Sequence, residues 1–100
     1  MEYIFNYDGV AASEALETYL KEKMSKLDRK YSWMVRAEVF FKNEKKSGEN
    51  AGKICEIQIS APGPRLFAKS SKENYHAAVS DAVNQLEPQL EKRKAEIKTH

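Results

Sequence analysis

The sequence predicts an α+β fold: a two-layer sandwich of one four-stranded sheet with both helices on one face, in the order β-α-β-β-β-α. Segments in which apolar and polar residues alternate are typical of half-buried strands, and four of them occur. Two further segments carry apolar residues at helical spacing. The chain has 100 residues, which suffice for one core between two packed layers. We therefore expect residues 1–100 to form a single domain.

The first strand and the first helix are predicted over residues 2–7 and 14–31. Alternation in the strand places its aromatic residues on the inner side. Ser13 precedes the helix and is a good N-cap residue. The predicted buried stripe of this helix consists of Leu16, Leu20, Met24, Leu27 and Tyr31.

The second and third strands are predicted over residues 33–42 and 53–60. Residues 43–52 between them are polar, contain two glycines and predict a hairpin loop. One face of each strand is apolar, and we expect it to be the inner face: Val35, Ala37, Val39 and Phe41 in one strand, and Cys55, Ile57 and Ile59 in the other.

The fourth strand and the second helix follow a Pro-Gly-Pro turn. The strand is predicted over residues 66–70, and Ser70 with Glu73 has the spacing of a capping box. The helical stripe comprises Val79, Ala82, Val83, Leu86 and Leu90. Pro88 lacks an N–H and should kink the helix. Residues 91–100 lose the stripe, so we expect a fraying tail.

The composition argues against an enzyme. Cys55 lies among isoleucines, which favours a buried structural thiol, and His76 and His100 are not spaced as metal ligands. We expect no metal, cofactor or small-molecule substrate. The sequence shows no membrane span or signal peptide, which indicates a cytoplasmic protein. The net charge is only +2, so binding to a polyanion would need clustered charge.

The first helix supplies such a cluster. Lys23, Lys26, Lys30 and Tyr19 fall within about 60° around the helix axis at 100° per residue. Three ammonium groups in a line could follow a phosphate backbone. The same pattern is also typical of an ordinary solvated helix flank with Glu–Lys neighbours. The sequence leaves both readings open.

The sheet face away from the helices carries its own group of apolar residues. If the aromatic side chains of the first strand face inward, four residues face outward: Ile4, Phe40, Ile54 and Phe67. They are either scattered exposed apolar residues or a contact patch for a partner, a second copy or stacked bases. The second reading predicts weak self-association through this face.

Three stretches of the chain resemble one known family. They are AL at 15–16 leading into KxxKL at 23–27, EIQISAPGPRLFAK at 56–69, and NYHAAVSDAV at 74–83 with QLEPQLEKRK at 85–94. Together they make the sequence similar to short-form ribosome hibernation promoting factors of the ribosome-associated inhibitor A / sigma-54 modulation protein family. The resemblance covers essentially the whole chain, and the family's β-α-β-β-β-α fold is the order predicted above.

The resemblance implies a non-enzymatic protein that binds 16S rRNA in the mRNA–tRNA cleft of the small ribosomal subunit and silences idle ribosomes under starvation. Lys23 and Lys26 match lysines of the family's first helix. The full set of rRNA-binding residues that we expect from it is Lys23, Lys26, Arg29, Lys30, Arg65, Lys69, Lys92 and Lys94.

The second helix departs from the family pattern. Gln85, Glu87 and Pro88 stand in a stretch where relatives commonly carry basic residues. Fewer phosphate contacts would make ribosome binding weaker and less salt-sensitive. A second hypothesis follows: a diverged member that acts as a protein-interaction module through the apolar sheet face.

Overall fold

The computed structural model describes residues 1–44 and 52–98. Its six elements follow the predicted order: β1 (Glu2–Asp8), α1 (Glu14–Lys30), β2 (Arg36–Asn43), β3 (Lys53–Ser60), β4 (Leu66–Lys72) and α2 (Tyr75–Lys98). Most of the predicted loop at 43–52 and the last two residues of the predicted tail lie outside the described residues.

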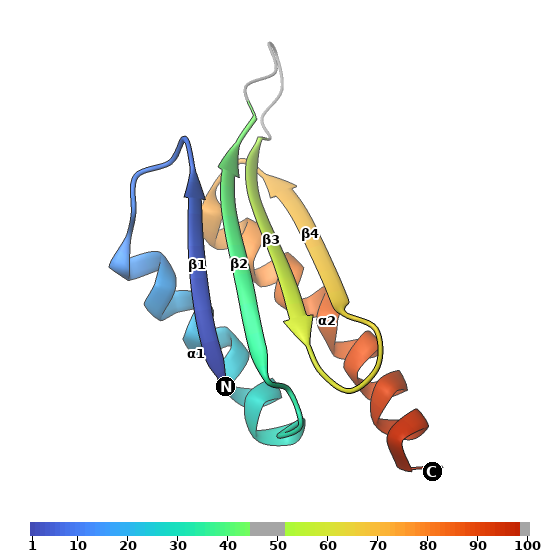
Figure 1. Cartoon of the computed structure of the whole chain (residues 1–100). Helices are drawn as coiled ribbons and strands as arrows, with labels where there is room; N and C mark the ends of the chain where they lie inside the picture. The colour runs from blue at the N-terminus through green and yellow to red at the C-terminus, as the bar shows by residue number, and fades with distance from the viewer. Residues whose placement is uncertain (45–51, 99–100) are drawn as a thin grey trace.

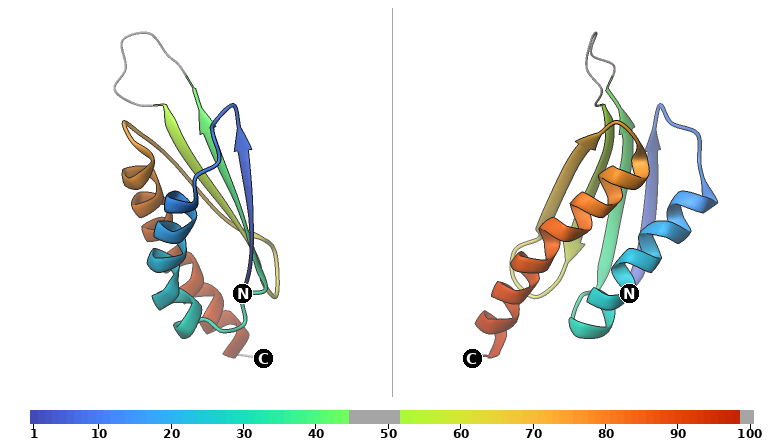
Figure 2. Two further views of the ribbon diagram at one scale, coloured as in Figure 1. Left: turned by 90° about the vertical axis from the view of Figure 1, so that its left-hand side faces the viewer. Right: turned by 180° about the vertical axis from the view of Figure 1, so that it is seen from behind.

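The four strands form one mixed sheet in the order β1-β2-β3-β4. β1 pairs with β2 in parallel, and α1 provides the crossover between them. The other two pairs are antiparallel. Both helices lie behind the sheet in Figure 1, and the side view in Figure 2 shows them on one face. The predicted two-layer architecture is therefore confirmed.

The two helices run side by side in the same direction (Figure 2, right). Near their first turns, the ring centres of Tyr19 and His76 are 4.6 Å apart. Toward their other ends, Lys30 and Tyr31 share a surface hollow with Glu91. One flank of α2 therefore faces α1, and its opposite flank faces strand β4.

The core contains both predicted helical stripes. Leu20, Met24 and Tyr31 of the first stripe and Leu86 and Leu90 of the second are fully buried. They pack on the inner residues of β2 and β3, as the alternation predicted. Tyr3, Phe5 and Tyr7 of β1 are partly buried and pack against the same core cluster.

Two local predictions were wrong. β2 begins at Arg36 rather than residue 33, and Val35, predicted to face inward, is 60% exposed. α2 is capped by Asn74, whose Oδ1 accepts a hydrogen bond from Ala77 N at 2.8 Å. Ser70 belongs to β4 and donates to Asp81 Oδ2 at 2.7 Å, so it caps no helix.

Pro88 lies inside α2, which continues through it to Lys98. The proline interrupts the hydrogen-bond pattern without ending the helix. Its side chain is exposed, so water can reach the carbonyl group that it leaves without an intrahelical donor.

Candidate nucleic-acid interface

The outer flank of α1 carries the predicted line of ammonium groups. Ser13 begins the helix, because its Oγ accepts a hydrogen bond from Leu16 N at 3.2 Å. The apolar side of the helix is buried in the core and fixes its rotation. Lys23, Lys26 and Lys30, which we name the lysine row, are consequently all exposed.

Aromatic rings lie beside both ends of the lysine row. Lys23 Nζ is 5.4 Å from the ring centre of Tyr19, and Lys30 Nζ is 5.4 Å from that of Tyr31. An ammonium group over a ring is attracted by the ring quadrupole but keeps its charge and donors. These contacts orient the two side chains and leave them available to an anion.

Two carboxylates of α2 act on the Lys30 end of the row. Within residues 1–44 and 52–98, no carboxylate oxygen lies within 4.0 Å of the ammonium groups of the row. The pKa of Lys30 is nevertheless raised, first by the polar contact of its ammonium with Tyr31 and further by the charges of Glu91 and Glu87.

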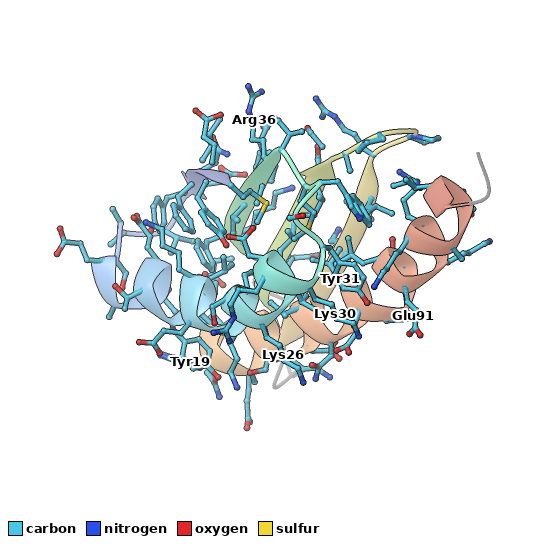
Figure 3. The ribbon with its side chains drawn as sticks, turned by 90° about the horizontal axis from the view of Figure 1, so that it is seen from below. Tyr19, Lys26, Lys30, Tyr31, Arg36 and Glu91 are labelled. Atoms are coloured by element: carbon cyan, nitrogen blue, oxygen red, sulfur yellow. The ribbon has the colours of Figure 1, made fainter. Side chains whose placement is uncertain are left out.

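α2 adds one cation to the same surface. Lys94 Nζ lies 5.9 Å from the ring centre of Tyr31, the same ring that Lys30 contacts. In Figure 3 the labelled Tyr19, Lys26 and Lys30 lie on the helix side of the molecule, with Arg36 on the opposite side. The basic surface is therefore made by α1 and the end of α2.

Three of the other predicted residues, Arg65, Lys69 and Lys92, lie around β4 instead. Arg65 donates to Gln58 Oε1 at 3.0 Å on the open face of the sheet, and Lys92 borders a hollow beside it. Lys69 is exposed on β4, opposite Glu56 of β3. Arg29 is exposed on α1. The predicted set thus divides between the helix side and the region around β4.

The flank of α2 that faces β4 has a structural task. β4 is an edge strand, and its outward backbone groups at Phe67 and Lys69 have no strand partner. Gln89 Oε1 accepts from Phe67 N at 3.4 Å and its Nε2 donates to Phe67 O at 2.8 Å. Gln85 makes the same pair with Lys69, at 3.3 and 3.0 Å. We name Gln85 and Gln89 the glutamine clip.

The spacing of the glutamine clip matches that of the strand. Four residues of a helix rise about 6 Å and two residues of a strand about 6.6 Å. Gln85 Nε2 also donates to Asp81 Oδ2 at 3.1 Å, and Gln89 Nε2 to Gln85 O at 3.0 Å. These bonds hold both amides in orientation. In the sequence, Gln85 stood out only as a position without the expected basic residue. The signal for the glutamine clip was the pair of glutamines four residues apart.

The open sheet face is less apolar than predicted. Ile54 is only 4% exposed, so its predicted place in an exposed patch was wrong. Ile4 and Phe67 are 36% and 48% exposed. Two polar residues separate them in the sheet: Ile4 lies opposite Glu38, Glu38 opposite Gln58, and Gln58 opposite Phe67. Self-association through this face stays a prediction.

Cys55 is a buried thiol, as predicted. Burial and the nearby charge of Glu56 raise its pKa to about 12, so the thiolate needed for nucleophilic attack is not formed near neutral pH. In the described part of the chain, no three His, Cys, Asp or Glu side chains gather as a metal site would need. No helix among these residues is long and apolar enough to cross a bilayer.

The fold is shared with two solved structures. One is a ribosomal subunit interface protein from Coxiella burnetii, with a TM-score of 0.83 and 23% identity over 95% of this chain and 99% of that one. The other is the N-terminal domain of Protein Y from Thermus thermophilus, with a TM-score of 0.74 and 24% identity over 92% and 98%. At these identities the likeness shows the fold alone.

Sequence comparison identifies the family. The ribosome hibernation promotion factor of Deinococcus radiodurans is 30% identical over 86 residues, which are 85% of this chain and 44% of that protein. The chain therefore spans less than half the length of this relative. The family described as Sigma 54 modulation protein / S30EA ribosomal protein matches residues 3–98. This chain belongs to that family.

Proposed function

We propose that the protein is a ribosome-associated translation inhibitor. It binds 16S rRNA in the mRNA–tRNA cleft of the small ribosomal subunit and silences idle ribosomes during starvation. Family membership and the names of its relatives, a hibernation promotion factor and a subunit interface protein, support this proposal. The observation that carries it is the lysine row, whose ammonium groups are exposed on a helix fixed to the core.

The proposed mechanism is occupancy. Leu20, Met24 and Leu27 anchor α1 to the sheet, so the lysine row is presented without a folding step on binding. Phosphate contacts from these residues would position the domain and release counterions, while its bulk excludes mRNA and tRNA. No bond is made or broken, and no group with a catalytic pKa is needed.

α2 contributes less to this grip than α1. Gln85 and Gln89 are held by β4 and are unavailable to RNA. Glu87 and Glu91 place negative charge near the end of the lysine row. We therefore expect fewer phosphate contacts than in a relative with a basic second helix, and a correspondingly shallower dependence of affinity on salt.

The experiment is cosedimentation with small ribosomal subunits across a salt series. Replacing Lys23 and Lys26 by Ala removes about two phosphate contacts. Binding should become roughly 50-fold weaker at about 0.1 M salt, and the slope of log K against log salt should fall by nearly two units.

The matched control is Lys53→Ala with Lys72→Ala. These lysines lie opposite each other on β3 and β4, so the control removes the same charge from another part of the molecule and relieves a like-charge pair. It should weaken binding much less. Equal losses in the two double variants would remove α1 from the site. Wild-type protein that stays unbound at low salt would end the proposal.

A further inference from the structure

The two edge strands of the sheet, β4 and β1, differ in how they are covered. The glutamine clip binds β4, and Figure 2 (left) shows β1 from its own edge, with α1 beside it. Glu2 N donates to Val35 O at 3.2 Å, so the backbone groups of Glu2 point toward β2. Because these groups alternate in direction along a strand, the N–H and C=O groups of Tyr3, Phe5 and Tyr7 point away from β2.

The outward backbone groups of β1 are open to another strand. Within residues 1–44 and 52–98 they have no hydrogen-bond partner. Natural edge strands are commonly protected by a lysine, a proline or a bulge. β1 has the sequence EYIFNYD, without lysine or proline, and its register with β2 is unbroken from Glu2 to Asp8. Seven residues of edge can therefore accept a strand by β-augmentation.

β1 of a second copy fits this edge. In an antiparallel pair about a twofold axis at Phe5, Phe5 lies opposite its own counterpart, and Tyr3 lies opposite Tyr7 of the other copy. These are the residues whose backbone groups point outward, so each opposed pair can exchange two hydrogen bonds. Their rings, which are partly buried in the single molecule, would meet on the helix side of the joined sheet. Cross-strand aromatic pairs of this kind are stabilising.

The charges beside β1 complement each other in this pairing. Lys21 Nζ lies 5.7 Å from the ring centres of both Tyr3 and Phe5, and Glu17 Oε2 accepts from the Tyr7 hydroxyl at 2.7 Å. Since Tyr7 lies opposite Tyr3 of the other copy, Glu17 of one copy is brought beside Lys21 of the other. The twofold axis repeats this pair. Lys21 has no carboxylate within 4.0 Å in the described part of the chain, so its charge is available.

One contact opposes the association. The same register places Glu2 opposite Asp8 of the other copy, at both ends of the paired strands. Basic neighbours in β2 reduce this repulsion: Arg36 Nε lies 2.8 Å from Glu2 Oε1, and Lys42 lies opposite Asp8. A single strand pair is a small interface, so we expect a dissociation constant on the order of 0.1 mM.

We propose that β1 is a self-association edge, through which two copies of this chain join their sheets antiparallel about Phe5. The pair is held by the backbone groups of β1 and by reciprocal Glu17–Lys21 contacts. This surface is distinct from the open face of the sheet. It also leaves the lysine row exposed, because that flank of α1 faces α2, where Tyr19 contacts His76. The inference goes beyond the proposed function and does not depend on it.

The test is sedimentation equilibrium of the full-length protein without ribosomes, from about 10 µM to about 1 mM. Lys21→Glu and Glu17→Lys each place like charges together at both reciprocal contacts, so each should weaken association at least roughly tenfold. In an equimolar mixture of the two variants, every reciprocal contact again joins opposite charges. The mixture should regain the association of the wild type, which a loss of folding in either variant would prevent.

The matched control is Lys72→Glu, which makes the same change of charge on the exposed end of β4 and should associate as the wild type does. A second measurement reads the register. Ile4 lies opposite Asn6 of the other copy, with Cα atoms about 4.5 Å apart, a separation that a disulfide can span. Ile4→Cys mixed with Asn6→Cys should therefore form a disulfide-linked pair much faster than either variant alone. The natural Cys55 is buried and should not compete.

Four results would overturn the inference. They are a wild type that remains monomeric at the highest concentration, a mixture of the two charge variants that associates no better than either one, a Lys72→Glu variant that loses association equally, and cysteine variants that cross-link no faster when mixed. None of these measurements involves the ribosome. A protein that cosediments with small subunits but gives one of these results keeps its proposed function and loses the self-association edge.

Discussion

The two helices use their polar flanks in opposite ways. α1 exposes Lys23 and Lys26 to solvent, without an ion pair to any carboxylate of the described residues. α2 turns Gln85 and Gln89 onto the edge of the sheet, where their amides pair with the backbone of β4. One flank is free for a ligand, and the other completes the fold.

This difference explains the unusual second helix. A lysine or arginine has no acceptor and could not form the paired bonds that each glutamine makes with a peptide group. Gln85 and Gln89 are therefore suited to holding α2 against β4, which a basic residue at either position could not do in the same way. The glutamine clip also covers backbone groups that would otherwise be open to another strand. At positions 85 and 89 of α2, a residue can either add to the basic surface or cover the edge of the sheet, and here both cover the edge.

Removing the glutamine clip should give the largest effect on stability. Gln85→Ala with Gln89→Ala deletes four bonds to β4, each with a modest net value at the surface, so the free energy of unfolding should fall by about 3 kcal/mol. The opened edge should also promote self-association, visible by light scattering at high concentration.

The comparison between the helices supplies the control for this double variant. Lys23→Ala with Lys26→Ala changes two exposed residues of α1, and the free energy of unfolding should change by less than about 0.5 kcal/mol. If the two double variants were equally stable, the glutamine clip would have no structural role and the contrast between the helices would fail.

Pro88→Ala should have the next largest effect, in the opposite direction. It restores an N–H inside α2, and the lower helix propensity of proline is only partly offset by its restriction of the unfolded chain. The free energy of unfolding, measured in urea, should rise by about 2 kcal/mol. A loss of stability would indicate that α2 is fitted to the proline in a way that the hydrogen-bond pattern does not show.

The smallest effect concerns pH. The pKa of Asp81 is lowered from 3.8, first by the hydrogen bond from Ser70 and also by Gln85 and Lys72. Asp81 thus stabilises the fold above its unfolded pKa, and this contribution is lost as pH falls through the lowered pKa. The stability difference between wild type and Asp81→Asn, measured in urea, should shrink between about pH 5 and pH 2. A constant difference would contradict this assignment.

Local patterns predicted most of the fold. The alternation at 53–60 gave β3 with both its ends, because one face of this strand is packed in the core. The stripe of α1 was predicted for the same reason. The capping box was wrong because Ser70 and Glu73 satisfy a spacing rule while β4 continues to Lys72 and Asn74 caps α2.

Contacts between distant segments could not be predicted in this way. Gln85 lies 16 residues from Lys69, and no short-range rule connects a helical glutamine with an edge strand. The exposure of the lysine row was predicted, whereas the acidic influence on Lys30 depends on how α2 lies beside α1. Ile54 was assigned to the correct face, but periodicity does not report what covers a residue.

The parallel pairing of β1 has a consequence for synthesis of the chain. β1 is made before β2, its one strand neighbour among the described residues, and β2 begins at Arg36, beyond the whole of α1. No backbone ladder can therefore form while the early segments emerge. Until β2 is made, the aromatic side chains Tyr3, Phe5 and Tyr7 of β1 therefore lack the strand beside which they pack. The chain passes through this stage on the ribosome, the same particle that the folded protein is proposed to silence.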